Sequence, residues 1–73
     1  MKNFNDISDF YNYMHYSSRA MIKYGGSFAK ILGNLIEVSD FSNLNKIYNV
    51  WKDLIEEYYE LYEKMDKKES ENG

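Results

Sequence analysis

Apolar residues recur at steps of three and four positions through the second half of the chain. The positions that keep this rhythm are Leu44, Ile47, Tyr48, Trp51, Leu54, Ile55, Tyr58, Leu61, Tyr62 and Met65. The positions between them are nearly all polar or charged, so the pattern predicts one amphipathic α-helix over about residues 41–65. Asp40 or Ser42 is the expected N-cap, because either side chain can accept a hydrogen bond from an amide of the first turn.

A second apolar rhythm runs through the first half of the chain. It passes through Ile7, Phe10, Met14, Ser17, Met21 and Tyr24, and continues in phase through Phe28, Ile31, Leu35 and Val38. We expect a helix over about residues 6–24, with Asn5 or Asp6 as its N-cap, and a helix over about residues 27–38. In the later stretch the apolar face is wide and covers about half of the circumference.

The pair Gly25-Gly26 separates these two stretches and allows two interpretations. A glycine inside a helix costs about 1 kcal/mol relative to alanine, which favours a break, with Ser27 capping a new helix. The preserved phase instead favours one long helix kinked at the pair. The fold class is all-α in both cases: a small helical bundle or a kinked helical hairpin of two to three helices.

Small residues are spaced four apart around this pair. Gly25, Ala29 and Gly33 would lie on one ridge of a helix, where small side chains allow another helix backbone to approach closely. The pattern does not tell whether the second helix belongs to the same chain. We expect a single helical domain over residues 1–65, followed by a disordered charged tail over residues 66–73.

Composition narrows the class of protein. The chain has no cysteine and no proline, which excludes disulfide frameworks and cysteine-based metal sites. No apolar run is long enough to span a bilayer and no signal peptide is evident, so we expect a cytoplasmic protein without membrane association. The formal net charge is −3, and most of the acidic excess lies after residue 52. Nucleic acid is therefore not the expected partner.

The sequence does not contain a set of residues that would support catalysis. His15 is the only histidine, and its helical neighbours Tyr11 and Arg19 are not partners for base catalysis. The glutamates of the second half are spaced to face water and have no histidine beside them, as a di-metal site would require. We therefore expect no enzyme activity, no metal and no cofactor.

Thirteen aromatic residues in 73 indicate interfaces, because aromatic side chains dominate interface energetics. Two or three helices of this length cannot cover both apolar stripes, so we expect a homo-oligomer, most simply a dimer, and an unidentified protein partner. The candidate interface residues are Phe28, Ile31, Leu35, Trp51, Tyr58 and Tyr62. The alternative is a nucleotide- or nucleic-acid-binding accessory protein, which would use Tyr16, Arg19, Lys23 and Lys30.

Residues 27–62 resemble small uncharacterised helical proteins encoded by bacteriophages and prophages. The positions that carry the resemblance are Asp40, Asn43, Ile47, Trp51, Tyr58 and Tyr62. The resemblance implies a phage or mobile-element context, in which proteins of this size bind a host or phage protein and modulate it. It implies no particular activity, and no residue here is diagnostic of one.

Overall fold

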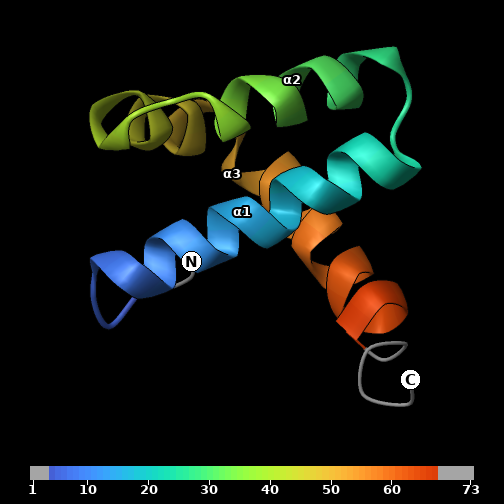
Figure 1. Cartoon of the computed structure of the whole chain (residues 1–73), viewed down its shortest axis with the longest axis horizontal. Coiled ribbons are helices and arrows are strands. Elements are labelled where there is room, and N and C mark those ends of the chain that lie inside the picture. The colour runs from blue at the N-terminus through green and yellow to red at the C-terminus, as the bar shows by residue number, and fades with distance from the viewer. Residues whose placement is uncertain (1–3, 68–73) are drawn as a thin grey trace.

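Three α-helices and one short π-helical turn make up a small all-α bundle. The computed structural model describes residues 4–67, and within this range every regular element is helical: α1 (Ile7–Tyr24), α2 (Ser27–Glu37), α3 (Phe41–Tyr62) and the turn η1 (Glu63–Lys67). The all-α prediction is therefore confirmed. Figure 1 shows α2 returning alongside α1 in the opposite direction, while α3 crosses behind α1.

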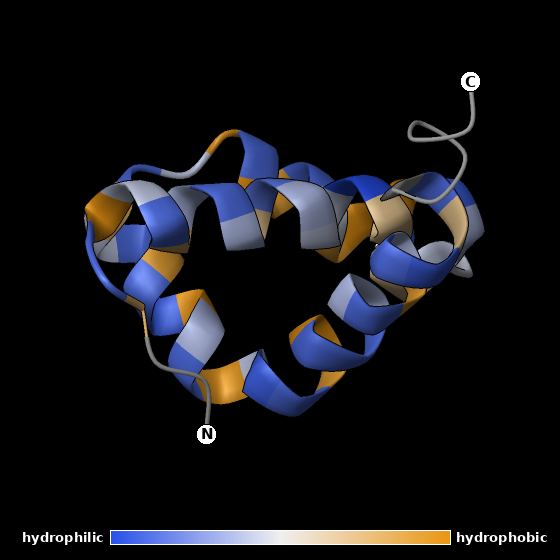
Figure 2. Ribbon diagram, turned by 90° about the horizontal axis from the view of Figure 1, so that it is seen from below, coloured by the Kyte–Doolittle hydropathy of each residue, from blue (hydrophilic) through white to orange (hydrophobic). Residues whose placement is uncertain are grey.

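Helix α1 is the centre of the bundle. It packs against both α2 and α3, whereas α2 and α3 touch each other only slightly. Figure 2 shows apolar and polar segments alternating along each helix, as amphipathic helices require. The buried core residues are Phe10, Tyr13, Met14, Ala20 and Met21 of α1, Ala29, Leu32 and Ile36 of α2, and Leu44 and Ile55 of α3.

Aspartates begin the first and the third helix. The carboxylate of Asp6 accepts a hydrogen bond from the amide of Asp9 at 2.9 Å, and that of Asp40 accepts one from the amide of Asn43 at 2.9 Å. Of the two candidate caps at each helix start, the observed ones are Asp6, not Asn5, and Asp40, not Ser42. Helix α2 begins differently, because its N-cap is Gly26 and offers no side-chain hydrogen bond.

The chain breaks its helix at Gly25-Gly26 and does not continue as one long kinked helix. Both glycines have negative φ and extended backbone, so neither needs the left-handed region. They differ in the space around them. A Cβ at Gly25 would meet the Cβ of Ala29 and lie 2.6 Å from the carbonyl oxygen of Met21, whereas a Cβ at Gly26 would meet nothing within 4 Å.

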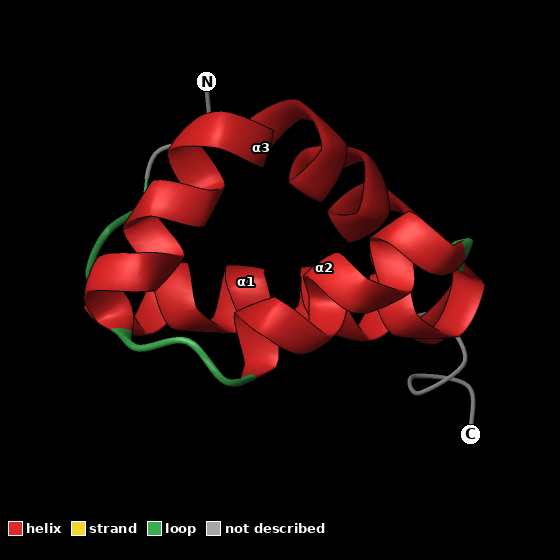
Figure 3. Ribbon diagram, turned by 90° about the horizontal axis from the view of Figure 1, so that it is seen from above, coloured by secondary structure: helices red, strands yellow, loops and turns green. Residues whose placement is uncertain are grey.

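Helix α3 is bent, which the sequence did not predict. Trp51 has φ −115° and ψ 22°, outside the helical region, and Figure 3 shows the bend midway along the helix. Leu44 and Ile55, the two buried residues of α3, lie on opposite sides of it. In a straight helix they would be about 16 Å apart, so the bend allows both halves of α3 to lean on α1.

The carboxyl end also differs from the expected single helix over residues 41–65 and the tail over 66–73. The α-helix ends at Tyr62, and η1 follows it through Lys67. Asp66, expected in a disordered tail, belongs to η1 and is held by hydrogen bonds from Lys23 and Tyr24 of α1. The rest of the predicted tail, residues 68–73, lies outside the described residues, as do residues 1–3 of the predicted domain.

Candidate functional site

Three large apolar side chains of α2 and that of its C-cap residue are exposed. Phe28 and Leu35 are each 49% exposed, Ile31 is 70% exposed and Val38, the C-cap, is 80% exposed. Their steps of three, four and three residues place them in one row along the helix. We call these four residues the α2 ridge.

The opposite face of α2 packs on α1 and contains two small residues beside two large ones. Ala29, Leu32, Gly33 and Ile36 are buried there. A Cβ at Gly33 would lie 2.9 Å from the carbonyl oxygen of Ser18 and 2.9 Å from Cγ1 of Ile22, so the two helices meet too closely for any larger residue. In the structure, the spaced small residues of α2 therefore face α1 of the same chain.

Trp51 extends the α2 ridge onto the third helix. Its ring packs edge-on against Phe28, with the ring centroids 5.0 Å apart, and it remains 38% exposed. The sequence pattern includes Trp51 in the apolar stripe of this helix and also makes it a candidate interface residue. Its contact with Phe28 places it beside the start of α2, so it adds apolar surface to the ridge.

The other two candidate interface residues are half-buried. Tyr62 stacks on Tyr16 of α1 with the centroids 4.6 Å apart and the rings 11° from parallel. Tyr58 lies beside the glycine break, where its hydroxyl would be 3.1 Å from a Cβ at position 25. Both side chains thus serve the chain's own packing. Val38 was missing from the candidate set, although the three-and-four rhythm that selected Leu35 reaches it too.

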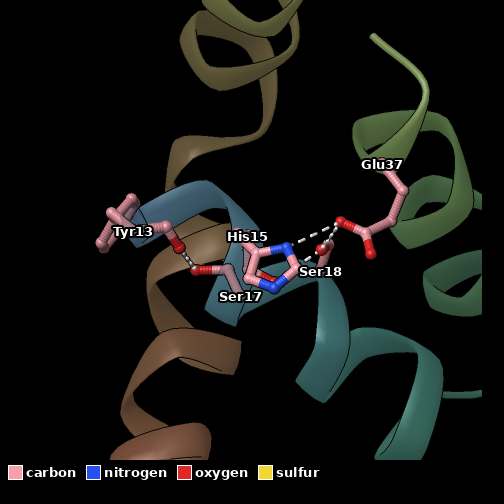
Figure 4. Close-up of polar contacts among 5 residues, drawn as sticks. All are labelled: Tyr13, His15, Ser17, Ser18 and Glu37. Carbon is pink, nitrogen blue, oxygen red and sulfur yellow. Dashed lines mark hydrogen bonds and ion pairs between the residues drawn. The ribbon is translucent and has the colours of Figure 1, made fainter. Parts of the chain in front are cut away.

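A polar cluster joins the middle of α1 to the end of α2 (Figure 4). The Glu37 carboxylate lies 3.2 Å from Nδ1 of His15 and accepts a hydrogen bond of 2.9 Å from the Ser18 hydroxyl. These are the residue types of a hydrolase triad, but the arrangement differs. Ser18 bonds to Glu37 and to the carbonyl oxygen of His15, not to the imidazole ring, and it is 0% exposed. A substrate could not reach this hydroxyl, so the cluster ties two helices together.

The concave surface beside this cluster is too small for most organic ligands. The pocket has a volume of about 140 Å³ and is lined by residues that include Tyr11, His15 and Glu37. Ligand sites usually enclose roughly 300–1,000 Å³. Over the described residues no group of three or more histidine or acidic side chains is placed to hold a metal ion.

Aromatic side chains fill the contact between α1 and α3. Tyr13 meets Tyr48 edge-on, with the centroids 6.1 Å apart, and lies 4.7 Å from the ring of Tyr59. Burial, with a smaller effect of the nearby Glu56 carboxylate, raises the pKa of Tyr13 far above its usual value. This tyrosine therefore stays protonated at any physiological pH, as a packing residue does.

Three of the four residues in the alternative binding set are engaged within the chain. Tyr16 stacks on Tyr62, the Lys23 ammonium lies 2.8 Å from the Asp66 carboxylate, and the Lys30 ammonium donates to the carbonyl oxygen of Ile22 at 2.9 Å. Arg19 is exposed. The four side chains do not converge on one open site.

Asp66 is the centre of a contact between η1 and the end of α1. It accepts hydrogen bonds from Lys23 at 2.8 Å and from the Tyr24 hydroxyl at 2.7 Å. These bonds lower the pKa of Asp66 below its usual value, and the bond to Asp66 raises the pKa of Lys23 to about 12. The pair therefore stays charged across the physiological range, which favours a structural role.

None of the helices over residues 4–67 combines the length and apolar character that crossing a membrane requires. No family model, no curated protein and no solved structure matches this chain.

Proposed function

We propose that this chain is a small, non-enzymatic protein–protein interaction module whose binding surface is the α2 ridge together with Trp51. The observation that carries the proposal is the exposure of five large apolar side chains in one continuous area. Contiguous exposed apolar surface of this kind marks interaction sites in soluble proteins, whereas apolar residues scattered singly do not.

The composition of this surface supports the same proposal. It combines one tryptophan, one phenylalanine and three aliphatic side chains, and none of the five residues is charged. Interface centres are enriched in aromatic residues and depleted of charged ones. Covering a side chain such as Ile31 contributes about 1.5–3 kcal/mol, so a few of them suffice to anchor a partner.

The module would self-associate and would bind or modulate another protein. The phage or prophage resemblance makes that partner a protein of the host cell or of the phage, and the site of action the bacterial cytoplasm. The acidic second half of α3 would face a basic surface of such a partner. Neither a cofactor nor a metal enters this proposal.

A matched pair of substitutions tests the surface. Ile31→Glu places a charge at the centre of the ridge, and Ile7→Glu makes the same change at an isoleucine that is 59% exposed near the start of α1, outside the ridge. The parent chain and each variant are immobilised and exposed to bacterial lysate. The protein that the parent retains is then purified, and its binding to all three chains is measured by calorimetry.

The parent and Ile7→Glu should bind the purified partner equally, and Ile31→Glu should bind at least about tenfold more weakly, because a buried charge and lost apolar contact each oppose binding. Equal binding by all three chains would place the binding surface elsewhere and contradict the proposal. Circular dichroism of each variant checks that the helices remain.

A further inference from the structure

The α2 ridge has the spacing of a two-helix seam. Phe28, Ile31, Leu35 and Val38 follow steps of three, four and three, the spacing at which two helices interlock side chains along their length. A partner that fits such a seam presents a helix with the same spacing. A second copy of this chain presents one, and in a two-fold pair the same surface serves both copies.

The charged residues of α2 do not oppose such a pairing. Lys30 and Glu37 lie off the ridge and are engaged within their own chain, Lys30 with the carbonyl oxygen of Ile22 and Glu37 with His15 and Ser18. Two ridges would therefore meet without like charges at the seam, although each chain has a net charge of −3.

The ends of α2 have few capping and charged groups of their own. Its first turn has no acidic residue, its last turn has no basic residue, and Gly26 provides no side-chain cap. The helix dipole is therefore uncompensated by charged side chains of α2 at either end. Helix α1 already lies antiparallel to α2 within the chain, so the helix ends do not decide the direction of the pairing and side-chain volumes do.

Side-chain volumes favour an antiparallel pairing. In an antiparallel pair, Phe28 lies opposite Val38 of the second copy, so the largest ridge residue meets the smallest, and Ile31 lies opposite Leu35. A parallel pair would set phenylalanine against phenylalanine at one end and valine against valine at the other, which leaves one end crowded and the other loose.

The available area is sufficient for a specific contact. The exposed fractions of the ridge and Trp51 correspond to about 500 Å² of apolar surface per copy. Stable interfaces bury roughly 800 Å² per partner in total and incidental contacts less than about 400 Å². The apolar centre alone exceeds the second value, and the polar rim of α2 would supply the rest.

We propose that a second copy of this chain covers the α2 ridge, with the two α2 helices antiparallel and the two-fold axis passing between Ile31 and Leu35. The inference rests on the proposed function, since it names the occupant of the same surface. Phe28 packs on Val38 of the other copy, and Ile31 packs on its Leu35. The two-fold symmetry repeats each of these contacts with the two copies exchanged.

Disulfide trapping tests the pairing, because the chain has no cysteine of its own. Ile31→Cys, Leu35→Cys and an equimolar mixture of the two are refolded under reducing conditions and then oxidised. In the antiparallel pair, position 31 of one copy faces position 35 of the other. The two copies of position 31 are offset from each other by about 6 Å along the helix axes, as are the two copies of position 35, which puts them out of disulfide reach. Asn12→Cys, on the exposed side of α1, reports random collision.

The expected result is a 31–35 disulfide in the mixture, identified by mass spectrometry, that forms several-fold faster than any disulfide of the single variants or the control. Fast disulfides in each single variant would show a parallel pair and overturn the proposed direction. Formation at the control rate in every sample would overturn the second copy as the occupant. That last result would not contradict the proposed function, which the titration of the purified partner with Ile31→Glu tests independently.

Discussion

The two faces of α2 are both apolar, yet one is packed inside the chain and the other faces solvent. The inward face contains Ala29 and Gly33 beside Leu32 and Ile36, and the outward face contains the ridge, which has no small residue. The small residues let the backbone of α1 come within contact distance, which larger residues would prevent. Ala29 and Gly33, for which the ridge has no counterpart, let the inward face pack within the chain, and the ridge is available to a partner.

Neighbouring positions 35 and 36 give the sharpest test of this comparison. Ile36 is 3% exposed on the inward face, and Leu35 is 49% exposed on the ridge. Ile36→Ala should lower the free energy of unfolding by about 2–5 kcal/mol, because it removes buried methyl groups and leaves a cavity. Leu35→Ala should change it by about 0.5 kcal/mol or less, measured by urea unfolding in dilute solution.

The milder Ile36→Val keeps this test usable if the alanine variant does not fold, with an expected loss of about 0.5–1.5 kcal/mol. Equal losses at positions 35 and 36 in dilute solution would mean that the two faces do not differ as described.

The glycines give a second, smaller contrast. Gly33→Ala places a Cβ 2.9 Å from the Ser18 carbonyl oxygen and should lower the free energy of unfolding by about 1–2 kcal/mol, because overpacking outweighs the gain in helix propensity. Gly26→Ala places the same Cβ in open space and should change the value by about 0.5 kcal/mol or less. Thermal unfolding of the two variants side by side measures this, and a stabilised Gly33→Ala would contradict the close packing.

Local signals predicted the local features of this fold. Asp6 and Asp40, each one of two expected caps, are the observed ones, and the break at Gly25-Gly26, one of two interpretations, follows from the low helix propensity of glycine. Each depends on residues within about one turn of one another, so the sequence alone contains the information. The expected cap Ser27 is wrong, because the N-cap of α2 is Gly26.

Features that depend on how the helices cross were not predictable in this way. The bend at Trp51 accompanies contacts of both halves of α3 with α1, through Tyr48 before it and Tyr62 after it. The contact of His15 with Glu37 joins residues 22 positions apart, and that of Lys23 with Asp66 joins residues 43 positions apart. A hydrophobic rhythm specifies the face of each helix but not the angle at which two faces meet. The same limit applies to Trp51, Tyr58 and Tyr62, which follow one apolar rhythm. Trp51 is exposed, whereas Tyr58 and Tyr62 are half-buried.

The smallest expected effect lies at the contact of η1 with α1. Because the folded chain lowers the pKa of Asp66, the carboxylate stabilises the fold at pH values above its usual pKa of about 4, and this stabilisation is lost as the pH falls through the lower folded pKa. Asp66→Asn should therefore be less stable than the parent at neutral pH, and the difference should disappear in acid.

The effect of Asp66→Asn should be smaller than those at Ile36 and Gly33, since water and salt screen surface pairs. Urea midpoints measured from neutral pH into acid, with Asp53→Asn as the exposed control, would show the difference closing only for Asp66→Asn. A gap that persists in acid would mean that Asp66 acts through packing and not through its charge.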